Sequence, residues 1–174
     1  DGTVIREYVT IHRSGFENGV TKVGKSCLLM AYSHVGHDCE IGNEVVVVNS
    51  TALSGHVIVE DKAFISGLVG VHQFVRIGRN AMVGGMARVN QDILPFSTVE
   101  GNPARLYSAN IVGLKRANFK PVVRAAIKKA LNVIAQPELN TKQAVEKILV
   151  EIEVFDEIKY LIDFIENSSR GVTK

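Results

Sequence analysis

Four of the five histidines of this 174-residue sequence fall between residues 34 and 72, at His34, His37, His56 and His72. Near neutral pH an imidazole can act as a general base, a metal ligand or a hydrogen-bonding group. His37 is followed directly by Asp38, and a carboxylate beside an imidazole base can fix its tautomer, as in a catalytic dyad. Adjacent side chains of a strand point to opposite faces, however, so the pairing of His37 with Asp38 depends on the local backbone.

The histidines lie inside a repeat with a period of six residues. Every sixth residue from position 23 to position 89 is aliphatic, and the residue four positions later is small or β-branched. The aliphatic set is Val23, Leu29, Val35, Ile41, Val47, Leu53, Val59, Ile65, Val71, Ile77, Val83 and Val89. Amphipathic helices and alternating strands do not have this period, whereas a solenoid of short strands does.

The repeat predicts a mainly β fold, a left-handed parallel β-helix over residues 1–104. Three hexapeptides form one coil of eighteen residues, and backbone groups pair with the coils about 4.8 Å above and below. Ile5 and Ile11 share the phase of the repeat, and residues 13–20 are predicted to form a loop between repeats.

The period stops after Asn102-Pro103, and residues 105–174 are predicted to form a small α-helical C-terminal cap. Pro121 suits the first position of a helix with an apolar stripe, and Asn140 suits the cap of a second helix from about residue 141. A third helix is expected to carry Ile158 to Ile165.

Stacked coils of eighteen residues bring the histidines to one edge of the solenoid. His37 lies above Gly55, which adjoins His56, and position 56 lies above position 74, two residues after His72. A cluster of titratable groups on one edge favours a chemical role. Two other interpretations remain open at this point: rings that only hydrogen-bond a neighbouring chain, and a metal site, since imidazole is a common zinc ligand.

Composition excludes several classes of protein. The sequence is 46% hydrophobic and 22% charged, which is typical of globular proteins. Its apolar runs, such as Val45–Val48, are far shorter than the roughly 18 residues of a transmembrane helix. With no signal peptide after Asp1, a cytoplasmic location is expected. Cys27 and Cys39 lack a C-x-x-C pattern and are predicted to be buried thiols.

A basic segment follows the repeat. Residues 105–137 contain no acidic residue and seven basic ones: Arg105, Lys115, Arg116, Lys120, Arg124, Lys128 and Lys129. The segment lacks the interleaved aromatic residues of nucleic-acid platforms, so no nucleic-acid partner is expected. It is either a docking surface for an acidic partner or a solvated helix face.

Seven motifs are spread along the chain: REYVTIHR at 6–13, SHVGHDCEIGN at 33–43, LSGHVIVED at 53–61, GVHQF at 70–74, MVGG at 82–85, EGNPAR at 100–105 and GLKRANF at 113–119. Together they resemble the motifs of the UDP-N-acetylglucosamine O-acyltransferase family, which performs the first step of lipid A biosynthesis. The resemblance implies a homotrimer of left-handed β-helices with active sites between subunits. It also implies transfer of an R-3-hydroxyacyl chain from acyl carrier protein to the glucosamine 3-position of UDP-N-acetylglucosamine, without a cofactor or a metal.

The resemblance implies roles for individual residues as well. His37 matches the family's general base, Asp38 the carboxylate that polarises it, and Gly55 the residue whose backbone N–H stabilises the oxyanion. The positions that match substrate-positioning residues are His34, His56, His72 and Gln73. Asn110 and Arg116 match contacts near the nucleotide and the carrier's phosphopantetheine, and Gly85 matches the position that measures acyl length.

The sequence departs from the family at a few points. The family has further coils before the segment matched by Asp1, so the β-helix is expected to be truncated on its N-terminal side. Val112 and Ala117 stand where some members have a glutamate and a second arginine. Three alternatives stay open: the related UDP-acylglucosamine N-acyltransferase, a γ-class carbonic anhydrase with intersubunit zinc, and a non-catalytic β-helix remnant. The sequence also leaves open the preferred length of the acyl chain and whether the acceptor sugar carries a 3-hydroxyl or a 3-amino group.

Overall fold

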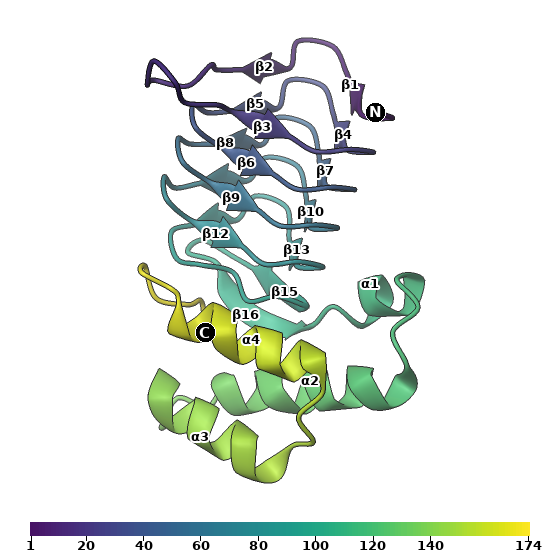
Figure 1. Cartoon of the computed structure of the whole chain (residues 1–174), viewed down its shortest axis with the longest axis vertical. Coiled ribbons are helices and arrows are strands. Elements are labelled where there is room, and N and C mark those ends of the chain that lie inside the picture. The colour runs from purple at the N-terminus through teal and green to yellow at the C-terminus, as the bar shows by residue number, and fades with distance from the viewer.

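In the computed structural model, which describes residues 1–174, the chain winds as a parallel β-helix above four helices (Figure 1). The coils turn in a left-handed sense from the N-terminus at the top towards the helices (Figure 1). Each of the first four coils has three two-residue strands, one in each of three sheets. The fold class predicted from the six-residue repeat is confirmed.

The three sheets, which we call A, B and C, run along the solenoid axis. Sheet A contains β1 (Val4–Ile5), β4 (Leu28–Leu29), β7 (Val46–Val47), β10 (Phe64–Ile65), β13 (Met82–Val83), β15 (Ser97–Glu100) and β16 (Arg105–Ala109). Sheet B contains β2 (Thr10–Ile11), β5 (His34–Val35), β8 (Ala52–Leu53), β11 (Gly70–Val71) and β14 (Arg88–Val89). Sheet C contains β3 (Lys22–Val23), β6 (Glu40–Ile41), β9 (Ile58–Val59) and β12 (Arg76–Ile77). Neighbouring strands are parallel except β15 and β16 and, as in the pairing of Val46 with Phe64, mostly eighteen residues apart.

The period-six aliphatic residues form the centre of the solenoid. They belong to a core of 23 buried residues, against which Val23 packs half-buried. The positions four residues later are buried as well, and among their polar side chains Cys27, Cys39 and Thr51 donate to backbone carbonyls, whereas the Ser33 hydroxyl has no partner. The Sγ of Cys27 donates to the carbonyl of Gly42 at 3.1 Å, and the Sγ of Cys39 donates to that of Ser54 at 3.0 Å. Both thiols are free and buried, as predicted.

The outer corners share one backbone conformation. Every sixth residue from Ser26 to Met86 has a φ between 54° and 64°, in the left-handed region, and none of these residues is glycine. Such a conformation is costly for a side chain other than glycine and persists only where its surroundings fix it. Hydrogen bonds between coils do so here, as the N–H of His56 donates to the carbonyl of His37 at 2.9 Å.

The helical cap begins later than the sequence suggested. Residues 105–109, predicted to start the helical region, form β16, which pairs antiparallel with β15 and closes the last coil. The helices are α1 (Ile111–Arg116), α2 (Pro121–Ile134), α3 (Thr141–Glu151) and α4 (Asp156–Glu166). The helix starts at Pro121 and Thr141 are confirmed, and Asn140 forms a capping box with Gln143. None of these helices is long and apolar enough to cross a membrane.

A polar cluster joins the cap to sheet C. Tyr160 of α4 donates its hydroxyl to Glu60, and Glu60 accepts from the Arg76 Nε at 2.8 Å. The Arg76 guanidinium also lies 4.0 Å from the ring centroid of Phe164. Burial raises the pKa of Tyr160, so its hydroxyl remains a neutral donor. The cluster therefore fixes α4 against the solenoid.

Candidate functional site

Most of the histidines lie on the short segments that connect strands of sheet B to strands of sheet C. We call residues 36–39, 54–57 and 72–75, which stack on one another, the histidine edge. His37, His56 and His72 lie on this edge, and His34 lies just before it in β5. The stacking expected from the eighteen-residue period is what places these residues on one side of the solenoid, where the segments that join β5 to β6, β8 to β9 and β11 to β12 lie above one another. The strands that these segments connect can be followed in Figure 1.

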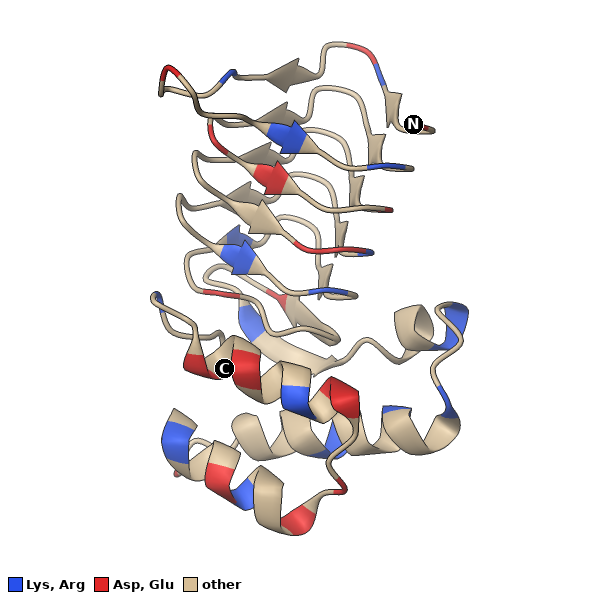
Figure 2. Cartoon of the chain, in the orientation of Figure 1, with Lys and Arg blue, Asp and Glu red and all other residues tan.

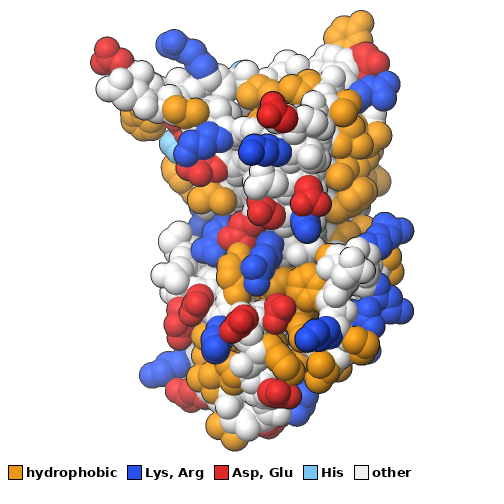
Figure 3. Space-filling model, turned by 45° about the vertical axis from the view of Figure 1, so that its right-hand side comes forward, with side chains coloured by type: hydrophobic (Ala, Val, Ile, Leu, Met, Phe, Trp, Pro, Cys, Tyr) orange, Lys and Arg blue, Asp and Glu red, His pale blue; other side chains and the backbone are white.

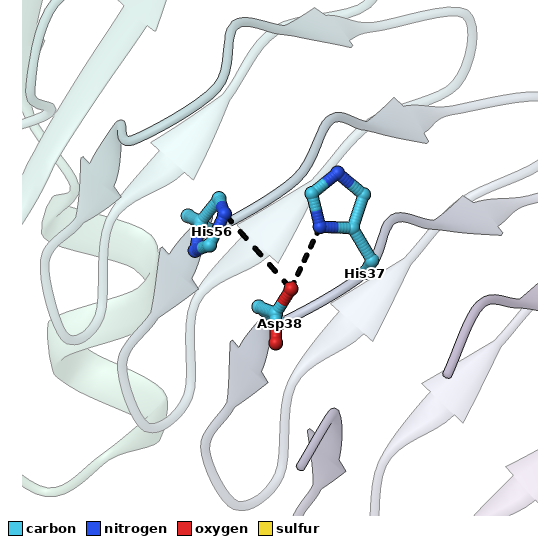
Figure 4. Close-up of side chains that lie close together, drawn as sticks. All are labelled: His37, Asp38 and His56. Atoms are coloured by element: carbon cyan, nitrogen blue, oxygen red, sulfur yellow. Dashed lines mark hydrogen bonds and ion pairs between the residues drawn. The ribbon is translucent and has the colours of Figure 1, made fainter. Parts of the chain in front are cut away.

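His37 and Asp38 form a hydrogen-bonded pair. The His37 Nδ1 lies 2.7 Å from the Asp38 Oδ2 (Figure 4). Their side chains do not point apart because Asp38 is a left-handed corner residue, with a φ of 60°, and not a strand residue. The corner turns the carboxylate back towards the preceding imidazole. The alternation rule that counted against the pair from sequence does not apply at a corner.

Asp38 is ionised, and its hydrogen bond sets the tautomer of the neutral His37 imidazole. Hydrogen bonds, the largest from Ser14 and the next from His37, lower the pKa of Asp38 to about 2, so the group is an ionised carboxylate at neutral pH. A carboxylate only accepts hydrogen bonds, so the His37 Nδ1 carries the proton. In the neutral imidazole the Nε2 then has a free lone pair, as a general base requires. The His37 side chain is 47% exposed, whereas that of Asp38 is 10% exposed.

His56 lies directly below the pair. Its Nε2 is 3.9 Å from the Asp38 Oδ2, too far for a hydrogen bond but close enough for an ion pair when the ring is protonated (Figure 4). The ring is nearly perpendicular to that of His37, with centroids 5.0 Å apart, and it stacks on Phe74 at 4.7 Å. These contacts fix the orientation of the His56 ring.

Gly55 lies beneath the His37 imidazole. A Cβ at position 55 would lie 2.5 Å from the His37 Nε2, so only glycine leaves room for the ring there. Lys25 and Asn43 hold the equivalent positions, one residue before the corner, between sheets C and A. There the backbone N–H of Lys25 donates to the Asn43 Oδ1, and the backbone N–H of Asn43 donates to the Asp61 Oδ1. The N–H of Gly55, like those of His37 and Gln73 at the equivalent positions of the neighbouring coils, has no hydrogen-bond partner within the chain. A free N–H therefore lies next to the candidate base.

The other predicted residues of this region surround the pair without bonding to it. The His34 Nδ1 lies 2.8 Å from the Thr10 Oγ1, and its ring packs edge-on against His12 at 4.6 Å. Burial and then the charge of His12 lower the pKa of His34. The His72 Nδ1 lies 3.2 Å from the carbonyl oxygen of Gln73. No hydrogen bond or ion pair joins His34 or His72 to the His37–Asp38 pair.

Three further predicted residues lie on other edges of the same chain. Asn110 and Arg116 line a cleft of about 620 Å³ between α1 and the solenoid, which we call the α1 cleft. The Asn110 side chain caps α1 and donates to the carbonyl of Asn80 at 2.9 Å. Gly85 lies at the join from sheet A to sheet B, near Gly67. One chain therefore does not bring Asn110, Arg116 and Gly85 together with His37.

Sequence reasoning missed the residues that hold Asp38. The hydroxyl of Ser14 and the backbone N–H of Gly15 both donate to its carboxylate, and the N–H of Asp38 donates to the Thr21 Oγ1. All three belong to the segment between β2 and β3. The interruption of the repeat at residues 13–20 marked this segment as a loop, but gave no sign of what its side chains bond.

His37, Asp38 and His56 also offer three metal-ligand atoms within 4.8 Å of one another. The cluster lies within one chain, whereas the carbonic anhydrase alternative needs zinc between subunits. The Asp38 oxygens, however, already accept from Ser14, Gly15 and His37. The Oδ2, which is the oxygen nearest both imidazole rings, already accepts from Gly15 and His37, so a cation bound there would have to displace one of them and the geometry favours the acid–base pair.

Comparisons with known proteins find similar proteins along the whole chain. A family model described as UDP N-acetylglucosamine O-acyltransferase, domain 2, matches residues 92–173, and a bacterial transferase hexapeptide model matches residues 20–55. An acyl-[acyl-carrier-protein]–UDP-N-acetylglucosamine O-acyltransferase from Alkalilimnicola ehrlichii is 40% identical over 175 residues, which cover 100% of this chain and 68% of that protein.

Another similar protein, with the same name, comes from Gloeothece citriformis. It is 54% identical over 148 residues, which cover 85% of this chain and 54% of that protein, so the chain spans about half the length of this relative. Among solved structures, the UDP-N-acetylglucosamine O-acyltransferase of Moraxella catarrhalis superposes with a TM-score of 0.92 at 33% identity, covering 100% of this chain and 68% of that one. The Francisella novicida acyltransferase gives 0.90 at 36% identity, with coverages of 98% and 63%.

Proposed function

Because the chain belongs to the UDP-N-acetylglucosamine O-acyltransferase family, we propose that it transfers an R-3-hydroxyacyl chain from acyl carrier protein to the glucosamine 3-hydroxyl of UDP-N-acetylglucosamine, as a step of lipid A biosynthesis. The observation that carries the proposal is the His37–Asp38 pair, with its Nδ1–Oδ2 distance of 2.7 Å, beside the unpartnered N–H of Gly55. No cofactor is required, because the acyl group arrives as a thioester on the carrier's phosphopantetheine.

The mechanism follows from the protonation state of the pair. The His37 Nε2 takes the proton of the sugar hydroxyl while the oxygen attacks the thioester carbonyl. Asp38 stabilises the imidazolium that forms, and the Gly55 N–H donates to the oxyanion of the tetrahedral intermediate. The intermediate collapses with loss of the thiolate, which receives the proton from the His37 Nε2. The products are the ester and the free thiol of the carrier.

The remaining predicted residues position the substrates. His34, His56, His72 and Gln73 lie at or beside the histidine edge, within reach of an acceptor held against His37. We assign Asn110 and Arg116 in the α1 cleft to the nucleotide and the phosphopantetheine, and Gly85 to the measurement of acyl length, because a glycine there leaves room for a longer chain.

The direct test is transfer itself. The purified protein is incubated with R-3-hydroxyacyl carrier proteins of several chain lengths and UDP-N-acetylglucosamine, and the product is identified by mass spectrometry. We expect one acyl ester per sugar and one free carrier thiol per turnover. Acylation only of a 2-amino acceptor would support the N-acyltransferase alternative. Stoichiometric zinc in elemental analysis would support the carbonic anhydrase alternative. If no transfer occurs even after the upstream coils of a relative are added, the non-catalytic β-helix alternative is supported.

The outer faces of the sheets support a homotrimer. The outward residues of sheet A are apolar from β1 to β13, namely Val4, Leu28, Val46, Phe64 and Met82, and hydrophobic side chains line the right-hand side of the solenoid in Figure 3. The outward residues of sheet C include Lys22, Glu40 and Arg76. A closed ring of three chains would cover the apolar faces and bring the histidine edge of one chain to the α1 cleft of the next.

The expected mass in sedimentation experiments at micromolar concentration is therefore that of three chains. Phe64→Glu should shift the mass towards one chain, because it places a charge in the buried contact. Ile58→Glu is the matched control, since Ile58 is similarly exposed but lies on sheet C. A single-chain mass for the unsubstituted protein would refute the ring.

The basic segment is proposed to dock the acidic carrier. Six of its seven cations are exposed, Arg124 is half-buried, and α1 and α2 carry no acidic residue (Figure 2). As the Debye length falls from about 10 Å towards 3 Å, transfer from the carrier should decrease far more than transfer from a small acyl-pantetheine. Reversing the charges of Lys120, Arg124 and Lys128 should mimic high salt, whereas Lys142→Glu on α3 should not. Equal salt sensitivity of the two donors would contradict docking.

A further inference from the structure

The join from sheet B to sheet C is longer in the first coil than in the coils below. Ten residues, 12–21, connect β2 to β3, whereas four residues, 36–39, connect β5 to β6. We call residues 12–21 the inserted loop. Because positions on this edge stack coil upon coil, the extra residues lie over the corner that carries His37 and Asp38.

The inserted loop changes how that corner is bonded. In the two coils below, the N–H of the left-handed corner residue donates to a backbone carbonyl of the coil above: His56 to His37 at 2.9 Å, and Phe74 to Gly55 at 3.2 Å. At Asp38 the N–H donates instead to the side-chain Oγ1 of Thr21, at 2.9 Å. The backbone of Asp38 is thus held by a loop side chain.

Ser14 holds the other end of the same residue. It is 7% exposed, and its hydroxyl donates to the Asp38 Oδ1. The N–H of Gly15 donates to the Oδ2 at 3.2 Å. The Ser14 Oγ also accepts from the N–H of Phe16 at 3.0 Å, and its contact with Asp38 is shorter than the 3.4 Å to the Phe16 carbonyl, the other acceptor near its hydroxyl. Both carboxylate oxygens of Asp38 are therefore fixed by the loop, and Oδ2 still accepts from His37.

The loop is shaped around this hydroxyl. A Cβ at Gly19 would overlap the Ser14 Oγ and would lie 3.2 Å from the Asp38 Oδ1. Glycine at position 19 is what lets the loop close over Ser14 while the hydroxyl reaches Asp38. Ser14 and Gly19 therefore both serve the hydrogen bond to Asp38: Ser14 supplies the hydroxyl, and Gly19 leaves the space for it.

We propose that Ser14 is a positioning residue for the transfer reaction, which holds the Asp38 carboxylate in the orientation that orients and polarises His37. The inference deepens the proposed function and depends on it. Ser14 contacts Asp38 and no other member of the candidate active site, so it acts through Asp38. The lowered pKa of Asp38, to which the Ser14 hydrogen bond contributes most, agrees with this geometry.

The test is a double-mutant cycle on kcat and KM. Ser14→Ala should lower kcat about 10- to 100-fold, the range expected for a hydrogen bond to a charged group, and leave KM unchanged. In an Asp38→Ala background the same change should have no further effect on kcat. Gly19→Ala should reproduce the loss of kcat by displacing the hydroxyl, whereas Glu17→Ala, an exposed change in the same loop, should have none.

Two outcomes would overturn the inference: a normal kcat for Ser14→Ala, or an equal loss of kcat with and without Asp38, which marks a merely structural role. If the unsubstituted protein transfers no acyl chain, it is the proposed function that fails. In that case the positioning role can still be tested without turnover, by measuring with NMR how fast the His37 Nδ1 proton exchanges with solvent. Its exchange with solvent should accelerate in Ser14→Ala and stay unchanged in Glu17→Ala, and an unchanged rate in Ser14→Ala would refute the positioning role.

Discussion

Substituting His37 by alanine should reduce kcat by about 10²- to 10⁴-fold, the usual contribution of a general base, with little change in KM. The reason is geometric. The His37 Nδ1 is committed to Asp38 at 2.7 Å, which leaves the Nε2 as the one atom of the pair that is free to take a proton. Steady-state kinetics with acyl carrier protein and UDP-N-acetylglucosamine measure the effect, and far-ultraviolet circular dichroism checks that the coils are intact.

His72 provides the comparison within the same edge. Its ring bonds only the neighbouring backbone, and no carboxylate contacts it. His72→Ala should therefore raise KM more than it lowers kcat. A near-normal kcat for His37→Ala would end the assignment of His37 as the base, and a larger kcat loss at His72 than at His37 would move the assignment to His72.

A single methyl group at Gly55 is expected to be almost as damaging. In Gly55→Ala the Cβ would lie 2.5 Å from the Nε2 and 2.6 Å from the Cε1 of His37, well inside contact distance, so the imidazole must leave its position above residue 55. The base and the neighbouring N–H would then no longer face the same substrate atoms. Misplacement by about 1 Å can cost on the order of 10²-fold in rate, and we expect a loss of that size in kcat.

The matched control is Gly70→Ala in β11. A Cβ at Gly70 meets nothing within 4 Å, and Ala52 occupies the equivalent place one coil above. Kinetics and thermal unfolding of the two variants separate the effects. Gly70→Ala should keep its kcat, and both variants should unfold close to the wild-type temperature. Wild-type kcat in Gly55→Ala would show that the ring position above residue 55 is not the productive one.

The solenoid could be predicted from the sequence because its signal is repeated. Twelve aliphatic residues in phase specify both the inward face and the eighteen-residue coil, and the structure buries every one of them except the half-buried Val23. Strand β16 carries no such signal. Residues 105–109 pair with β15 through a register fixed by contacts between the two strands, and a segment of five residues has no period by which to recognise it.

The candidate site was predictable in part, for the same physical reason. Stacking by eighteen placed the histidines on one edge, but the meeting of His37 with Asp38 depends on a left-handed φ at position 38 that residue types alone do not indicate. Ser14 was out of reach of the sequence argument, because its contact with Asp38 spans 24 residues through a loop outside the repeat. Asn110 and Gly85 were matched by motif, and one chain places them on edges away from His37.

The constant step between coils has a consequence for how quickly this chain reaches its native state. Parallel sheets are usually slow to form, because each new strand waits for a long crossover to close. From β4 to β14, neighbouring strands such as β7 and β10 are eighteen residues apart, about a tenth of the chain, which is the range of rapidly folding helical bundles. Each completed coil offers its backbone groups to the next coil. The parallel solenoid can therefore form from any coil that folds first and grow outward coil by coil.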